Sequence, residues 1–134
     1  MTYFLGIEIH QDQQGIFISQ EKYANEILNK FGMEKCKPDS TPLVSNEKLI
    51  KDDGVEKIDV FVYKSLIGFL LYLNATRPDI MYVASLLSRF MQSPSKLHFT
   101  VAKRVLRYVK GSKNLRIWFR RYGGSKLIGY IDND

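Results

Sequence analysis

The chain has 134 residues, of which 45% are hydrophobic, and it carries a formal net charge of +6 with a single cysteine. This length fits one small domain, and the apolar content excludes an intrinsically disordered protein. One cysteine cannot form an internal disulfide, the first residues lack the basic start of a signal peptide, and no apolar run reaches the roughly 18 residues of a membrane span. We therefore expect an intracellular protein, cytoplasmic or nuclear, that does not bind a membrane.

The first 31 residues have the pattern of two strands followed by a helix. Residues 2–10 and 15–19 alternate apolar and polar side chains on either side of a polar connector, which predicts an N-terminal β-hairpin. Ser19 is the expected N-cap of a helix that continues to Phe31, and Gly32 is expected to end it.

An irregular crossing is predicted over residues 33–58. This segment contains Pro38, Pro42 and Gly54 among polar clusters, and it has no sustained periodicity. A connector of this length in a compact domain is either functional or lacks a partner. We therefore expect a long segment that runs over the surface.

Three helices joined by short links are predicted next, which is typical of an antiparallel helical array. Asp59 is the expected N-cap of the first, which runs to about Asn74 and is apolar on nearly all sides, so we expect it to be mostly buried. Pro78 suits the first turn of the second helix, with Thr76 as its possible cap.

The third helix has one apolar and one cationic face. It starts after the N-cap candidate Ser95 and ends at Gly111, where a left-handed C-cap is expected. His98 falls in the apolar arc, where a hydrogen-bonded core histidine is expected rather than a metal ligand. At about 100° per residue, the basic residues share the opposite arc: Lys96, Lys103, Arg104, Arg107 and Lys110.

This cationic face lies in a block without acids. Residues 80–131 contain eleven Lys or Arg and no Asp or Glu. A solvated helix usually pairs Glu with Lys at i,i+4, which stabilises it by a few tenths of a kcal/mol per pair, whereas this helix places Lys103 beside Arg107. A solvated surface remains one interpretation, and the missing countercharge favours another, a nucleic-acid backbone as partner.

A C-terminal β-hairpin is predicted from residues 115–122 and 126–132, with Gly123 and Gly124 in its turn. Asp132 and Asp134 point to the same side of the last strand and could share a weakly bound Mg²⁺, although a solvated pair is the alternative. We find no phosphate-binding glycine loop, no zinc-ligand cluster and no serine elbow.

Seven strings that together cover nearly the whole chain are informative as a set. They are YFLGIEI (3–9), GIFISQEKYANEILNKFGM (15–33), CKPDSTPL (36–43), YKSLIGFLLYLNATRPDI (63–80), LLSRFM (86–91), AKRVLRYVKGS (102–112) and LIGYIDND (127–134). In this order and spacing they resemble the reverse transcriptase of copia-type LTR retrotransposons.

The resemblance implies an α+β chain in three parts. Residues 1–19 would be a primer-grip-like hairpin, residues 20–112 a helical thumb and connection segment that holds the template-primer duplex, and residues 113–134 the first hairpin of a truncated RNase H-like domain. The implied partners are an RNA/DNA hybrid or a DNA duplex, together with the palm and the other RNase H portions of a parent polyprotein. The residues that would lie near the primer's 3′ end are Phe4, Leu5, Gly6 and Ile7.

Catalysis is where the chain departs from the family pattern. The polymerase Tyr-x-Asp-Asp turn lies upstream of the first string and is absent, and the RNase H pattern ends with only its leading metal-binding carboxylate, at Asp132. Ile131 and Asn133 also replace the small residues more often found there. The parent enzyme uses Mg²⁺, but one carboxylate of a two-metal site cannot run the reaction. We therefore expect no tight Mg²⁺ binding and no activity from this chain alone.

On this reading the chain is a fragment that binds a duplex through its basic helical surface. Two alternatives remain open. One is an autonomous nucleic-acid-binding module without sequence specificity, because a face of Lys and Arg favours phosphate over base edges. The other is an inert, degenerate remnant that folds poorly.

Overall fold

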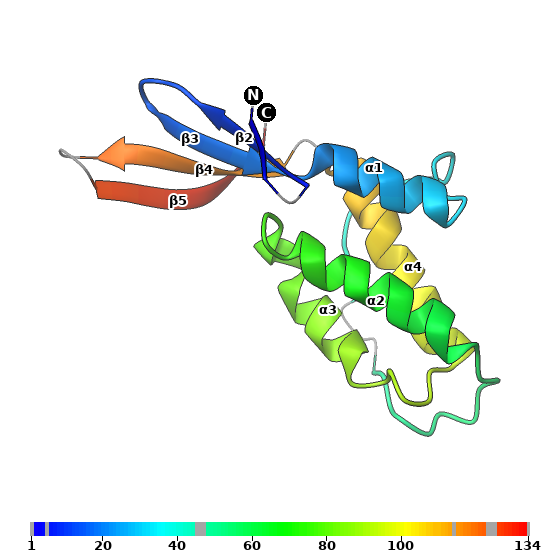
Figure 1. Cartoon of the computed structure of the whole chain (residues 1–134). Coiled ribbons are helices and arrows are strands. Elements are labelled where there is room, and N and C mark those ends of the chain that lie inside the picture. Colours follow the sequence, from blue (N-terminus) through cyan, green and yellow to red (C-terminus); the bar gives the residue numbers. More distant parts are fainter. Residues whose placement is uncertain (1, 5, 45–47, 114, 123–125, 134) are drawn as a thin grey trace.

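The chain folds into an antiparallel sheet and a group of helices (Figure 1), which confirms the predicted α+β class. None of the described helices is long and apolar enough to cross a bilayer. The computed structural model describes residues 2–4, 6–44, 48–113, 115–122 and 126–133.

The described strands form one five-stranded sheet in sequence order. The expectation of a single strand over residues 2–10 is wrong, because this segment breaks at Gly6. Gly6 has a φ of 81°, which favours glycine, and the chain reverses there so that Thr2 lies opposite Ile9. The strands are β1 (Thr2–Phe4), β2 (Ile7–Gln11), β3 (Gly15–Ser19), β4 (Leu115–Tyr122) and β5 (Lys126–Asn133).

The N-terminal and C-terminal strands belong to the same sheet, which the sequence did not predict. β3 pairs with β4, and Phe17 lies opposite Trp118 with 4.2 Å between their ring centroids. The predicted turn at Gly123 and Gly124 lies outside the described residues. The sheet extends from one end of the helical group in Figure 1, so the two ends of the chain are joined through β3 and β4.

The helices carry the main hydrophobic core. The side chains of α2, α3 and α4 that face one another are fully or almost fully buried, and α1 adds Ile27 and Leu28. In Figure 1, α2 and α3 lie next to each other and α4 lies behind α2. The helices are α1 (Glu21–Lys30), α2 (Val60–Leu73), a 3₁₀ turn (Pro78–Ile80) that leads into α3 (Met81–Ser88), and α4 (Lys96–Gly111).

Two of the predicted helix caps are confirmed. The Asp59 carboxylate accepts hydrogen bonds from the backbone N–H groups of Phe61 and Val62 at the start of α2. Ser95 accepts from the N–H of His98 at the start of α4, and the His98 ring accepts in return from the N–H of Ser95. These bonds satisfy donors that lack partners within the helix.

Three other predicted caps are wrong. Ser19 is the last residue of β3, and the carboxylate of Glu8 instead accepts from the N–H of Lys22 at the start of α1. Thr76 precedes the 3₁₀ turn, whose N-cap is Arg77, and the Thr76 hydroxyl donates to the buried side chain of Gln20. Gly111 is the last residue of α4 and has no positive φ. Helical residues therefore extend one position further than the glycine signal indicated.

Candidate nucleic-acid interface

The predicted cationic face exists on α4. One side of this helix is buried in the core, including Val101, Val105 and Val109. The opposite side carries the basic side chains, of which Lys96 is exposed and the others are half-buried. We call this set the cationic face: Lys96, Lys103, Arg104, Arg107 and Lys110.

The crossing segment, residues 33–58, supplies countercharge to this face. The Arg107 Nε donates to the Asp39 carboxylate at 2.6 Å, and an Arg104 nitrogen lies 3.8 Å from the other oxygen. Lys96 forms a 2.7 Å ion pair with Glu56. The interpretation that the cationic face lacks countercharge is therefore wrong, because its acids come from a distant part of the sequence.

Neutral oxygens of the crossing segment bind the cationic face as well. The Lys110 ammonium donates to the backbone carbonyls of Glu34 and Cys36, both at 2.6 Å. Arg104 donates to the carbonyl and the hydroxyl of Thr41. Lys103 differs from these residues, since its ammonium lies 4.9 Å from the centre of the Phe99 ring. Most of the cationic face is thus bound to the chain itself.

A buried histidine fixes the other end of the crossing segment. His98 is fully buried and stacks on Phe90, with 4.0 Å between ring centroids. Its Nδ1 accepts from the Ser95 N–H, and its Nε2 donates to the Ile50 carbonyl at 2.8 Å. The Ser95 hydroxyl donates to Asp53. His98 is therefore the hydrogen-bonded core histidine that the sequence predicted.

α2 presents an outward face that the described residues leave open. The expectation that α2 is mostly buried is only half right, because Phe61 is 81% exposed and Leu71 is 39% exposed, whereas Ile67 is buried. Gly68 lies in the middle of the exposed side, and apart from its chain neighbours and the adjoining helix backbone, no described atom lies within 4 Å of the place where a Cβ would stand. We call this surface the open face of α2: Phe61, Lys64, Gly68, Leu71 and Tyr72.

The turn that resembles a primer grip lies at the end of this open face. Gly6 is exposed, and a Cβ at this position would stand 3.8 Å from the Tyr72 hydroxyl and 3.9 Å from the Tyr23 ring. A cavity of about 130 Å³ beside the turn is lined by Gly6, Lys22, Tyr23 and Glu26. Of the other predicted residues, Phe4 ends β1, Ile7 begins β2, and Leu5 lies outside the described residues.

No catalytic metal site is found in the part of the chain that the structure describes, which contains no group of three or more His, Cys, Asp or Glu able to hold a metal ion. The backbone of Asp132 lies in β5, opposite Arg116 of β4. Asp134 lies outside the described residues. The predicted weak Mg²⁺ site at these two residues therefore stays a prediction.

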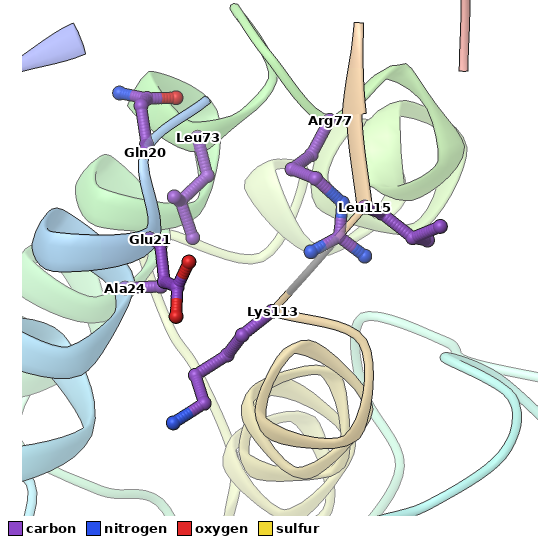
Figure 2. A pocket seen from close by; sticks show the side chains of 7 residues that line it. All are labelled: Gln20, Glu21, Ala24, Leu73, Arg77, Lys113 and Leu115. Atoms are coloured by element: carbon purple, nitrogen blue, oxygen red, sulfur yellow. The ribbon is translucent and has the colours of Figure 1, made fainter. Parts of the chain in front are cut away.

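A polar network joins the helices where they meet the sheet. The buried Arg77 donates two hydrogen bonds to Asp79 and two more to Ser112, which follows α4. Close by, Gln20 accepts from the Thr76 hydroxyl at 2.6 Å. Figure 2 shows Arg77, Gln20 and Lys113 around a cavity of about 10 Å³, which has room for about one water. This junction is therefore closely packed.

The network also shifts two pKa values. Burial alone would raise the pKa of the Asp79 carboxyl, but hydrogen bonds from Arg77 and Tyr108, together with the Arg77 charge, lower it below its usual range. Burial, followed by the hydrogen bond to Asp79, raises the pKa of the Tyr108 hydroxyl. Asp79 is therefore held as a carboxylate and Tyr108 as a neutral donor.

Comparison with known proteins gives a consistent group of relatives. The family model described as reverse transcriptase (RNA-dependent DNA polymerase) matches residues 1–45. An uncharacterized mitochondrial protein of Arabidopsis thaliana is 41% identical over 98% of this chain. The retrovirus-related Pol polyprotein from transposon RE2 of Arabidopsis thaliana is 36% identical over 100% of this chain. The corresponding polyprotein from transposon TNT 1-94 of Nicotiana tabacum is 36% identical over 97% of it.

The matched region is only part of each relative. The chain spans 55% of the mitochondrial protein, 9% of the RE2 polyprotein and 10% of the TNT 1-94 polyprotein. No solved structure matches significantly.

Proposed function

The chain belongs to the copia-type retrotransposon reverse transcriptases, and on this premise we propose that it is a non-catalytic part of an RNA-directed DNA polymerase that holds the template-primer duplex. The proposed ligand is an RNA/DNA hybrid or a DNA duplex, bound without sequence preference. The observation that carries the proposal is the open face of α2 with Gly68 at its centre.

Gly68 has no evident role inside the fold. Glycine in a helix interior is about 1 kcal/mol less favourable than alanine, and the surroundings of Gly68 would accept the Cβ of an alanine. A missing side chain at this position allows another surface to approach the helix backbone closely. A residue that lowers helix stability without improving the packing of the fold is typical of a binding site.

The chemistry of the open face suits the minor groove of a duplex. A-form helices have a wide, shallow minor groove that is recognised by shape and through sugar and phosphate contacts. Leu71 and Tyr72 can lie against sugars, and the exposed Lys64 can reach a phosphate. None of these groups selects a particular base, which fits a surface that must slide along any sequence.

The position of the primer-grip-like turn supports the same proposal. Because Tyr72 lies beside Gly6, the open face continues into the turn that the family resemblance places near the primer's 3′ end. A duplex bound along α2 would therefore run toward this turn. Catalysis would come from portions of the relatives that this chain does not span.

Fluorescence anisotropy with the 134-residue chain and labelled RNA/DNA hybrids of unrelated sequence tests the proposal. We expect similar affinities for all sequences at about 50 mM salt. Lys64→Glu should weaken binding and reduce the slope of log K against log salt by about 0.9, the value for one phosphate contact. Arg89→Glu, the same charge change at an exposed residue at the end of α3, outside the open face and the crossing segment, is the matched control.

Three results would contradict the proposal. They are absence of binding at this salt concentration, a salt slope near zero, and equal effects of the two charge reversals. A sharp base-sequence preference would contradict it as well, because none of the groups on the open face selects a particular base.

A further inference from the structure

We propose that the crossing segment is a built-in competitor for the cationic face of α4, which makes this face a second, covered duplex-binding surface. The inference rests on the proposed function, because it concerns how the same chain binds the same kind of ligand. It also assigns the irregular segment a role in regulating that binding.

The crossing segment offers the arginines the kind of acceptor that a nucleic acid would offer. Asp39 places a carboxylate against both Arg104 and Arg107, and its own N–H donates to the Arg107 carbonyl at 3.2 Å. Thr41 adds a carbonyl and a hydroxyl oxygen to Arg104. Guanidinium groups bind phosphate oxygens with the same geometry as carboxylates. The bound segment therefore occupies donors that a phosphate backbone could use.

The competition is incomplete because the cationic face retains excess charge. Among the described residues, its five cations meet two carboxylates within 4 Å, those of Asp39 and Glu56. Lys110 is bound by carbonyls, which carry no net charge, and the Lys96–Glu56 pair is largely exposed. A polyanion is therefore still attracted to this side of the molecule.

Only a short section of the segment has to move. Cys36 and Leu43 pack against the hydrophobic core, whereas every side chain in residues 37–42 is exposed or half-buried. Beyond this section, the bond between His98 and the Ile50 carbonyl holds the segment at the other end of α4. Displacement of residues 37–42 would uncover Arg104 and Arg107 and leave both attachments in place.

Hybrid binding by Asp39→Asn tests the proposal. The substitution keeps the shape of the side chain but removes the charge that competes with phosphate. We expect an affinity increase of about 3- to 10-fold at about 50 mM salt and a salt slope steeper by about 1 to 2, since each arginine released to a phosphate adds about 0.9. Asp52→Asn, an equal charge change at an exposed residue of the same segment, should raise affinity much less.

Hydrogen exchange of the unmodified chain gives a test that needs no variant. The Asp39 amide is protected by its bond to the Arg107 carbonyl, so saturating hybrid should speed its exchange while slowing exchange in α4. Equal affinities of the two variants, or an Asp39 amide that stays protected in the complex, would overturn this inference alone. If none of the proteins binds hybrid, both the inference and the proposed function are overturned.

Discussion

α2 and α4 pack on the same core, but their outward faces have different surroundings. α4 has the stronger positive charge, and the crossing segment binds four of its five cations. α2 has an apolar outward face, including Phe61 at 81% exposure, and the described residues leave it open. The more charged surface is thus the covered one, and the more apolar surface is available to a partner.

The composition of a helix does not determine what its outward face contacts. Asp39 is 68 residues from Arg107 in the sequence, so no local pairing rule could have indicated this ion pair. The apolar residues of α2 were expected inside because large apolar side chains are usually buried. An exposed apolar patch on a folded chain is typical of an interaction site.

The two sides of α2 should respond very differently to truncation, and this is the largest effect that we expect. Leu66 is fully buried, so Leu66→Ala should lower the free energy of unfolding by about 2–5 kcal/mol. Leu71→Ala, on the open face, should cost less than about 1 kcal/mol but weaken hybrid binding. Chemical denaturation and anisotropy measure both quantities. Equal losses of stability would show that the open face is buried in solution.

The start of α4 should be more sensitive than an ordinary exposed cap. Ser95→Ala removes the acceptor for the His98 N–H and the donor to Asp53, which links α4 to the crossing segment. We expect a loss of about 1–2 kcal/mol in unfolding free energy. Thr100→Ala, at an exposed residue of the same helix, is the control. A loss no greater than that of the control would mean that this attachment of the segment is weak.

Acid should weaken the junction between the helices and the sheet. Because the pKa of Asp79 is lower in the folded chain than in the unfolded chain, its contribution to stability is present above the unfolded value of about 3.9 and is lost as the pH falls through the folded value. Asp79→Asn should therefore lower stability at pH 7 and flatten its dependence on pH below about 4. Denaturation midpoints measured from pH 2 to 7 provide the check, and an unchanged acid dependence would contradict it.

Local signals predicted much of the fold. Asp59 and Ser95 were identified as caps because a short polar side chain precedes each apolar periodic run. The strand pair at the C-terminus followed from simple alternation. Ser19 was wrongly predicted as a cap because serine can also end a strand. The reversal at Gly6 was not predicted because apolar and polar residues continue to alternate on both sides of it.

Contacts between distant parts of the sequence could not be predicted from local signals. The contact between β3 and β4 joins residues about 100 positions apart, and neither strand carries a signal for its partner. For the candidate site, the cationic face was predicted from the helical spacing of its Lys and Arg residues. The contacts that the crossing segment makes with this face were not predicted. Gly68 could have been noticed as a glycine inside a predicted helix, which is a signal for a packing or functional reason.

The most direct test of duplex binding by the open face of α2 is Gly68→Leu, measured for stability and hybrid affinity together. Leucine favours helix more than glycine, and a Cβ at this position has open space around it, so the free energy of unfolding should rise by up to about 1 kcal/mol. The same side chain should block close approach of a duplex and lower affinity by about 10-fold or more. Asn29→Leu, on the exposed side of α1, is the matched control and should leave affinity unchanged. A Gly68→Leu chain that is folded and binds hybrid as tightly as the unmodified chain would contradict the account.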